Sequence, residues 1–412
     1  MTLLSNLARI VAVFWYSSSL VACTIPKATV PRPEGKPKPD RQNETVLIIG
    51  AGAAGLSAAY TLEYLGIDYK ILEASHDFGG RVKELPAGSF VDVPVDTGAE
   101  WIHVNPEILQ DLLLFEGQRA DVEIIDYNPQ TFSTYVDGQR YQRNWLRFLY
   151  GESKFYNTTW YSYFREFFYP YVKDKLILNA AVQSVDYSEP ERVLVKTPDG
   201  REFVGSRVIV ATPVSVLQKN AIRFVPELSR GKTEELKKVE MADGLKVFLE
   251  FDQRFYPDIQ FTTGLLSVPD AETEGDALYF DGLFKKPSGR TMMTLFQVGR
   301  KAGRRVRLTD DELLADVLAE LDQIFNGDAS RYFIKAHVEN WSAKPYIQGA
   351  YSINDTYDKD ILLSPVEDKI FFCGEYLAKG EENQATVHGA AISGREAALS
   401  LLEKINQGPD IP

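Results

Sequence analysis

The sequence contains few of the residues that form disulfide bonds and metal sites. Its 412 residues include two cysteines and four histidines. The histidines are widely scattered, and no set of cysteines, histidines or carboxylates has the short spacing typical of a metal site. Cys373 lies in an apolar run, so we expect a small buried core residue rather than a reactive thiol. We therefore predict no metal centre.

The sequence also lacks an excess of positive charge. Its 45 lysines and arginines are outnumbered by 58 acidic residues, which gives a net charge of −13 and a pI near 5.0. This balance disfavours a nucleic-acid partner, because clustered basic side chains are needed to replace phosphate counterions. An acidic field can attract cationic substrates, but carboxylates that merely keep a protein soluble explain the charge equally well.

No apolar run is long enough for a comfortable membrane span. Residues 10–20 form a short apolar run after a segment with one positive charge, which is typical of a signal-peptide core. Residues 20–23, Leu-Val-Ala-Cys, resemble a bacterial lipobox, in which the cysteine is lipidated and begins the mature chain. We predict a signal peptide over 1–22, a lipid anchor at Cys23 and a proline-rich tether over 23–43.

The alternative for the N-terminus is a cleaved secretory signal and a secreted, extracellular protein. Short glycosylation sequons give it some weight, and they begin at Asn43, Asn157, Asn340 and Asn354. If Cys23 is instead lipidated, Cys373 has no intrachain partner and no disulfide stabilises the fold.

The sequence does contain a glycine-rich turn after the apolar run 46–49. In this turn Gly50 allows a tight strand-to-helix connection, Gly52 lets the backbone approach a pyrophosphate, and Gly55 lets the helix pack on the strand. Glu73 ends the next apolar run, where an acid commonly binds an adenosine ribose. We predict a dinucleotide site whose phosphates meet a helix N-terminus.

The remaining segments alternate between helical and strand patterns. Residues 105–172 are rich in aromatic residues, and their pattern indicates helices. The other expected segments are a β-meander and return strand over 181–213, longer strands over 244–300, an amphipathic helix over 310–325, and a strand, loop and helix over 369–402. This order indicates a discontinuous nucleotide-binding domain into which a substrate domain is inserted.

The order of motifs resembles that of the flavin-dependent amine oxidases, which include monoamine oxidases, polyamine oxidases and lysine-specific histone demethylases. The glycine turn and Glu73 are followed by the motifs Gly-Gly-Arg at 79–81 and Gly-Ala-Glu-Trp-Ile-His at 98–103. A tryptophan and aromatic-wall segment at 341–352 and a final flavin motif at 372–394 complete the match. The resemblance covers most of residues 45–400.

This resemblance implies an α/β fold. We expect a discontinuous Rossmann-like FAD-binding domain over 44–104, 176–213 and 366–405. An inserted α+β substrate domain, with a mixed sheet flanked by helices, is expected over 105–175 and 214–365.

The resemblance also assigns residues to FAD. Glu375 is expected to hold the ribityl chain, and the helix starting at Thr386 faces the electron-rich edge of the isoalloxazine. Ala350 stands where monoamine oxidases carry the cysteine that bonds their flavin, so we expect non-covalent FAD. The residues predicted to bind FAD are Gly50, Gly52, Ala53, Ala54, Gly55, Glu73, Ala74, Gly80, Arg81, Gly98, Ala99, Glu100, Trp101, Val182, Trp341, Gly374, Glu375, Thr386 and Val387.

Four residues are predicted to serve catalysis. Lys246 stands where the family places a lysine near flavin N5 through a water, although strand periodicity alone also allows a solvent-facing lysine. Tyr351 is the expected aromatic wall, and Thr386 replaces the tyrosine that often faces it, which suggests a roomier pocket. His103 can orient substrate or water, or be structural. Glu100 is a further candidate, as the anion that receives a distal ammonium.

The resemblance implies an FAD-dependent amine oxidase that moves hydride from an amine carbon to flavin N5 and yields an imine or aldehyde and H2O2. A polyamine-type substrate is favoured, with dioxygen as co-substrate, no nucleic acid, and membrane contact only through the N-terminal anchor. The alternatives are an L-amino-acid oxidase or another FAD dehydrogenase or desaturase on this scaffold, and a non-catalytic tethered flavoprotein. An amino-acid oxidase should present an arginine to the substrate carboxylate, and none can be assigned securely.

Overall fold

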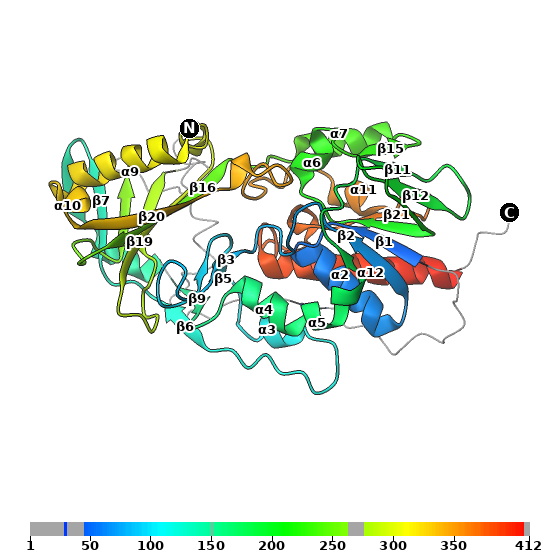
Figure 1. Ribbon diagram of the computed structural model, residues 1–412, viewed down its shortest axis with the longest axis horizontal. Helices are drawn as coiled ribbons and strands as arrows, with labels where there is room; N and C mark the ends of the chain where they lie inside the picture. Colours follow the sequence, from blue (N-terminus) through cyan, green and yellow to red (C-terminus); the bar gives the residue numbers. More distant parts are fainter. Residues whose placement is uncertain (1–28, 31–44, 150, 263–275, 408–412) are drawn as a thin grey trace, which may run out of the picture.

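The computed structural model describes residues 29–30, 45–149, 151–262 and 276–407. The predicted signal peptide, Cys23 and nearly all of the tether lie outside these residues. The chain forms two lobes, one built on a parallel sheet and one on a larger mixed sheet (Figure 1). Across the described ranges, no helix has both the length and the hydropathy to cross a bilayer.

A five-stranded parallel sheet organises the first lobe. Strand β1 (Thr45–Ile49) lies at its centre, and the strand order is β10 (Leu176–Ile177), β2 (Asp68–Leu72), β1, β14 (Arg207–Val210) and β21 (Ile370–Phe372). Val46 and Ile48 face one core, and Leu47 and Ile49 face another. The strands therefore alternate between two covered faces, as the period of two requires.

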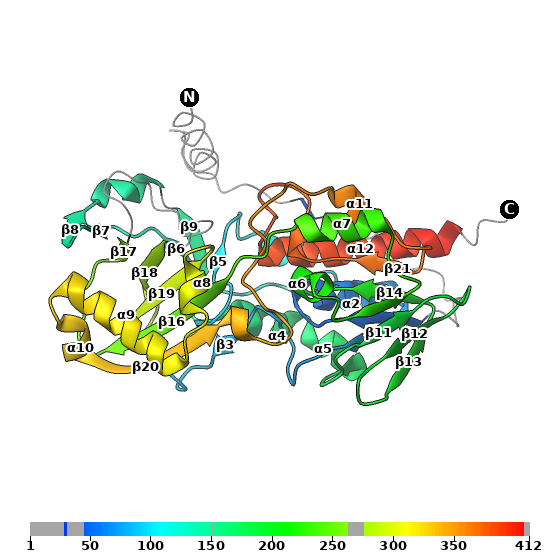
Figure 2. The ribbon, with the colours of Figure 1, turned by 90° about the horizontal axis from the view of Figure 1, so that it is seen from above.

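Two long helices cover the first face and a small sheet covers the second. Helices α2 (Ala53–Leu65) and α12 (Val387–Gln407) pack together in the core that contains Val46 (Figures 1 and 2). The opposite core is shared with a four-stranded sheet of β13 (Glu202–Gly205), β12 (Val193–Lys196), β11 (Ser184–Asp186) and β15 (Arg223–Val225).

Glycines allow the close approach of these two helices. A Cβ added to Gly394 of α12 would lie 2.0 Å from the Ala54 carbonyl oxygen at the start of α2. Gly55 instead lets α2 lie close to the turn after β1, since a Cβ added there would lie 1.9 Å from the Gly50 carbonyl oxygen. Both distances are far below van der Waals contact with backbone atoms, so only glycine fits at either position.

A seven-stranded sheet forms the second lobe. Its order is β20 (Phe333–Asn340), β16 (Gly244–Phe251), β19 (Thr291–Val298), β18 (Ala277–Asp281), β17 (Ile259–Thr262), β7 (Phe132–Val136) and β8 (Gln139–Gln142). Helix α9 (Asp310–Phe325) packs Leu313, Val317 and Leu321 against the Leu245 face of β16. The prediction of an amphipathic helix over 310–325 is confirmed, and Thr309 and Glu312 form its capping box.

The prediction that residues 105–172 are helical is wrong for their middle part. Helices α3 (Ile108–Asp111), α4 (Trp160–Phe167) and α5 (Tyr169–Val172) lie at its ends, whereas the middle contains β6 (Ile124–Tyr127), β7, β8 and β9 (Glu152–Phe155). Asp137 and Gly138 both have positive φ, as a two-residue hairpin turn between β7 and β8 requires. The Asp-Gly pair was therefore the missed signal.

The range 105–175 contributes to both lobes. Leu109 of α3 and Phe164 of α4 belong to the core around α2, while β7 and β8 extend the seven-stranded sheet. The predicted domain limits stay a prediction. The fold class, a Rossmann-like α/β domain combined with an α+β domain, is confirmed: the first lobe is built on a parallel sheet covered by helices, and the second on a mixed sheet packed against α9.

Replacement of Gly394 by alanine should destabilise the protein, because the new methyl group meets a backbone carbonyl that cannot move away alone. We expect a loss of about 3 kcal/mol or more in the free energy of unfolding, measured by urea denaturation. Gly231→Ala is the matched control, since nothing lies within 4 Å of its added Cβ and it lies in helix α7 (Arg230–Lys238). Equal midpoints for both variants would refute this account of the packing.

Candidate active site

The glycine turn presents the start of α2 to open space. Gly50 has φ +103°, and the Ala51 amide donates to Glu73 Oε2 at 2.7 Å. A Cβ added to Gly52 would meet nothing closer than the Gly79 carbonyl oxygen, 4.0 Å away. The backbone at Gly52 therefore leaves room for a ligand against the helix N-terminus.

The polar groups around the turn fit an adenosine diphosphate. The Thr212 hydroxyl is buried, and no hydrogen-bond partner for it occurs in the described part of the chain. The Thr212 amide nitrogen lies 3.7 Å from the Cβ position of Gly50, so this hydroxyl belongs to a residue beside the turn. Glu73 Oε1 accepts from the Ser75 amide at 2.9 Å and from the Ser75 hydroxyl, so Oε2 is the oxygen that retains a lone pair for a ribose hydroxyl.

An ion pair joins the N-terminal and C-terminal motifs. Arg81 Nη1 donates to Glu375 Oε1 at 2.9 Å and to the Ala350 carbonyl oxygen at 2.8 Å. The other carboxylate oxygen of Glu375 accepts from the Ser352 hydroxyl at 2.7 Å. The structure thus brings together Arg81, the aromatic-wall segment and the final flavin motif, which the sequence predicted to share one site.

Gly98 and Trp341 pack directly behind Arg81. A Cβ added to Gly98 would lie 1.8 Å from the Arg81 carbonyl oxygen and 3.0 Å from Trp341 Cζ2. Trp341 Nε1 donates to the Thr97 carbonyl oxygen at 3.1 Å. Two more predicted FAD residues, Gly98 and Trp341, therefore contact each other and the loop that carries Arg81.

Thr386 begins helix α12. Its hydroxyl accepts from the Gly389 amide at 3.0 Å and donates to the Asn383 carbonyl oxygen at 2.6 Å, which is the arrangement of a helix N-cap. Gln384 Nε2 donates to the Asn354 carbonyl oxygen at 2.6 Å. This bond holds the segment that follows Tyr351 beside the segment that leads into Thr386.

His103 lies near the start of α12 but is largely exposed. Its Nδ1 is 3.2 Å from Glu152 Oε1. Burial and, to a smaller extent, the charge of His103 lower the pKa of His388 to about 4, so His388 is neutral at pH 7. Tyr351 is half-buried, and its carbonyl oxygen accepts from the Ala242 amide at 3.0 Å.

The predicted adenosine-side residues lie around the end of β2. Ala74 and Val182 are half-buried, and Val182 packs against the core on the second face of the parallel sheet. The Ala180 amide donates to the Glu73 carbonyl oxygen at 2.7 Å, so the segment before Val182 is joined to Glu73. Which of these residues contact FAD stays a prediction.

Lys246 is buried, which rules out the solvent-facing alternative. It is 2% exposed, and its Nζ donates to Glu100 Oε2 at 2.8 Å and to the Asp96 carbonyl oxygen at 3.5 Å. Lys154 of β9 is fully buried and pairs with the other oxygen of Glu100. The Lys154 ammonium also lies 4.7 Å from the centre of the Tyr127 ring. One carboxylate thus holds two buried lysines.

The charges in this cluster are strongly coupled. Burial acts to raise the pKa of Glu100, but the ammonium groups of Lys154 and Lys246 outweigh it and bring the pKa to about 2. Burial raises the pKa of nearby Asp96 to about 8, so that carboxyl binds a proton at neutral pH. Burial lowers the pKa of Lys286, which interacts with Asp96.

This arrangement changes the interpretation of Glu100. Both of its oxygens are occupied by lysines, so the geometry gives no support to its expected role as the anion for a distal substrate ammonium. Trp101 lies beside the pair, with its ring centre 5.5 Å from Lys246 Nζ. Sequence reasoning missed Lys154 because residues 105–172 were predicted to be helical. The alternation of buried and exposed side chains along strand β9 was therefore not considered.

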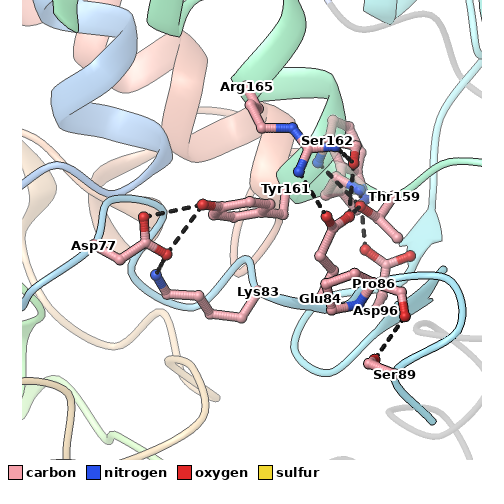
Figure 3. A network of polar contacts seen from close by, with 11 residues as sticks. Asp77, Lys83, Glu84, Pro86, Ser89, Asp96, Thr159, Tyr161, Ser162 and Arg165 are labelled. Atoms are coloured by element: carbon pink, nitrogen blue, oxygen red, sulfur yellow. Dashed lines mark hydrogen bonds and ion pairs between the residues drawn. The ribbon is translucent and has the colours of Figure 1, made fainter.

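A second polar network fixes the loop before and after Arg81 (Figure 3). The Tyr161 hydroxyl of α4 donates to the Asp77 carboxylate at 2.9 Å, and Lys83 Nζ donates to the same carboxylate at 2.5 Å. The carboxylate of Glu84 accepts from the Ser162 hydroxyl at 2.6 Å and from Arg165 at 3.0 Å. Helix α4 therefore holds the segments on both sides of the Gly-Gly-Arg motif, and no sequence signal linked these segments to α4.

No metal site accompanies these groups. Within the ranges that the structure describes, no three histidine, cysteine or carboxylate side chains are grouped so that they could hold an ion.

Comparison with known proteins identifies a family. A family model described as flavin containing amine oxidoreductase matches residues 53–163 and 170–402. Human lysine-specific histone demethylase 2 is 27% identical over 451 aligned positions, which cover 87% of this chain and 53% of that protein. Probable polyamine oxidase 4 of Arabidopsis thaliana is 31% identical over 229 positions, which cover 54% of this chain and 43% of that protein. The chain spans about half or less of the length of the curated relatives it matches.

Solved structures share the fold. Cyclohexylamine oxidase from Brevibacterium oxydans IH-35A matches with a TM-score of 0.71 at 17% identity and covers 88% of this chain and 100% of that chain. Wild-type putrescine oxidase bound to putrescine matches with a TM-score of 0.68 at 16% identity and covers 88% and 99%. At sequence identities of 16% and 17%, these matches show a shared fold alone.

Glu100→Gln should destabilise the protein, because two buried ammonium groups lose their shared counter-charge. We expect a loss of about 3–5 kcal/mol in unfolding free energy, and a partial recovery in the double variant Glu100→Gln, Lys154→Met, which removes one of the two charges. Glu202→Gln is the control, since its partner Lys196 is exposed and the midpoint should hardly change. A double variant no more stable than the single variant would contradict the shared-carboxylate account.

The effect of Glu100→Gln should depend on pH. The pKa of Glu100 falls from 4.5 in the unfolded chain to about 2 in the folded protein, so its stabilisation is complete above about pH 4.5 and is lost as pH falls towards 2. The difference in unfolding free energy between wild type and variant should therefore be constant from about pH 5.5 to 7 and smaller near pH 3.5. A difference that grows on acidification would show that the carboxylate is not held ionised.

Proposed function

Because this chain belongs to the family of flavin containing amine oxidoreductases, we propose that it is an FAD-dependent amine oxidase that oxidises the C–N bond of a small amine and releases H2O2. Polyamine-type amines are the favoured substrates. The support for them is that a probable polyamine oxidase and a putrescine oxidase are among the proteins this chain resembles. FAD is proposed to bind without a covalent bond, since Ala350 has no nucleophilic side chain.

The observation that carries the proposal is the position of the buried Lys246 ammonium relative to the predicted cofactor residues. Lys246 binds the segment 96–100 through Glu100 and the Asp96 carbonyl oxygen. Gly98 of that segment packs on the Arg81 backbone, and Arg81 binds Glu375. Three consecutive contacts thus connect the lysine to both ends of the proposed FAD site.

FAD, when bound, supplies the acceptor for the two electrons that leave the amine carbon. The chain's own residues position the reactants. The Lys246 ammonium has three donors, of which Glu100 and the Asp96 carbonyl oxygen accept two, so one donor is left to orient a water molecule. Trp101 and the buried residues of β16 exclude bulk water from the Lys246 ammonium. Because the charge is poorly screened there, its electric field at the site is stronger than it would be in water. Tyr351 is proposed to form the aromatic wall beside the neutral amine.

The function is tested by measuring peroxide release from the purified holoprotein on an amine panel. Spermine, spermidine, putrescine, benzylamine and several L-amino acids should be included, and flavin spectra should be recorded without oxygen. We expect peroxide with at least one polyamine. Flavin reduction without peroxide would indicate a dehydrogenase, turnover of L-amino acids alone would indicate an amino-acid oxidase, and a flavin that no substrate reduces would contradict an enzymatic role.

Lys246→Met should slow flavin reduction, flavin reoxidation or both by about a hundredfold or more, because a fixed proton donor is removed from the proposed reaction site. Stopped-flow absorbance separates the two half-reactions. Lys196→Met is the control, because Lys196 lies on the surface of β12 and pairs with the exposed Glu202. Wild-type rates in both half-reactions of Lys246→Met would remove Lys246 from the mechanism.

A further inference from the structure

Two aromatic side chains stand exposed on one side of a short 3-10 helix, η1 (Asn144–Leu149). Trp145 is 56% exposed and Phe148 is 71% exposed, the highest values among the large apolar residues that the structure describes. A 3-10 helix has three residues per turn, so residues 145 and 148 lie one above the other on the same side. We call Trp145, Phe148, Arg143 and Arg147 the η1 face.

The η1 face is held rigidly against the sheet. Leu146 is 4% exposed and packs in the core that contains Phe132 of β7. The Asn144 side chain accepts from the Phe132 amide at 2.9 Å. The segment η1 follows β8, the edge strand of the seven-stranded sheet, which lies at the rim of the second lobe (Figure 2).

The charge of the η1 face is opposite to that of the whole chain. Residues 138–149 contain three arginines and no acidic residue, although the protein carries a net charge of −13. Arg143 and Arg147 belong to the η1 face, whereas Arg140 lies 5.1 Å from the Phe325 ring, on the side of the sheet that α9 covers. The Arg147 guanidinium lies 4.8 Å from the centre of the Phe148 ring. Cationic and aromatic groups are therefore presented together on one small surface.

We propose that the η1 face is a contact surface for an anionic lipid membrane, in which Trp145 and Phe148 enter the headgroup region and the arginines bind lipid phosphates. Trp and Arg are suited to this boundary, because each has an apolar part and a polar end. The exposed area of the two rings is on the order of 300 Å². A stable interface with a second copy or another protein needs about 800 Å² per partner, whereas a few basic and aromatic groups suffice to add to membrane binding.

This surface is independent of the proposed oxidase reaction and of the lipid anchor proposed at Cys23. A membrane contact on the folded domain would supplement an N-terminal anchor, since stable attachment generally takes two signals. It would also fix which side of the second lobe faces the membrane.

The proposal is tested by vesicle sedimentation of the full chain with its own N-terminus. Vesicles of phosphatidylcholine alone are compared with vesicles containing one quarter phosphatidylglycerol. We expect the double variant Trp145→Ser, Phe148→Ser to bind the anionic vesicles about tenfold or more weakly than wild type. The variant Arg143→Gln, Arg147→Gln should lose about fivefold in affinity for each arginine and most of the salt dependence.

The matched control is Ile334→Ser, Tyr346→Ser, which removes two exposed apolar side chains elsewhere on the surface. It should bind like wild type, and circular dichroism melting should confirm that every variant is folded. Wild-type affinity in the η1 aromatic variant would overturn the proposal. A dimer that this variant abolishes, with no change in vesicle binding, would assign the face to a second copy instead.

Insertion of Trp145 is tested separately by quenching with brominated lipids. The Trp15→Phe background removes the tryptophan of the N-terminal apolar run, Trp160 and Trp341 are buried, and Trp101 is half-buried among the rings of Tyr127, Phe280 and Phe296. Quenching by anionic brominated vesicles should occur in this background and fall sharply when Trp145→Phe is added. Unchanged quenching on adding Trp145→Phe, or none in either protein, would overturn the insertion of this side chain.

Discussion

The ion pair between Arg81 and Glu375 is the constraint on which the proposed cofactor site depends. It joins residues that are 294 positions apart in the sequence, and it is completed by the Ala350 carbonyl and the Ser352 hydroxyl. Burial of the Glu375 carboxylate without a partner would cost free energy, and Arg81 and Ser352 supply its partners. The Glu375 carboxylate and the Ala350 carbonyl oxygen in turn accept hydrogen bonds from Arg81. The Gly-Gly-Arg loop, the aromatic-wall segment and the final motif are thereby fixed relative to one another.

Local signals predicted much of the first lobe and of α9. The glycine turn, the alternating runs of β1 and β2, and the acidic start of α9 are complete within a few neighbouring residues, so sequence alone identifies them. The hairpin of β7 and β8 was missed although its Asp-Gly turn is visible, because abundant aromatic residues suit a helical layer as well as a strand. The pairing of Lys154 with Glu100 could not be predicted, since it depends on β9 lying beside Trp101.

Lys246 shows the limit of periodicity most clearly. The alternation of side chains along the strand puts Lys246 on one face with Phe248 and Glu250. It does not show whether that face is exposed to solvent or covered by other residues. All eight residues of β16 are buried, because α9 covers one face and Val91 and Val93 belong to the core that contains Phe248 on the other. A strand covered on both sides can hold a charged side chain only where a counter-charge is supplied, and Glu100 supplies it.

The central parallel sheet has a consequence for synthesis of the chain. Its strands β1 and β2 emerge first, but its edge strand β21 and the helix α12 that covers it belong to the last part of the chain. Strands β7 to β20 are all made before these pieces appear. The first lobe is therefore completed only when translation is nearly finished. The start of α12 reaches the site after all the other strands and helices that line it have been synthesised. A bound cofactor would stabilise this final closure of the chain, since it would bind the closed form and not the open one.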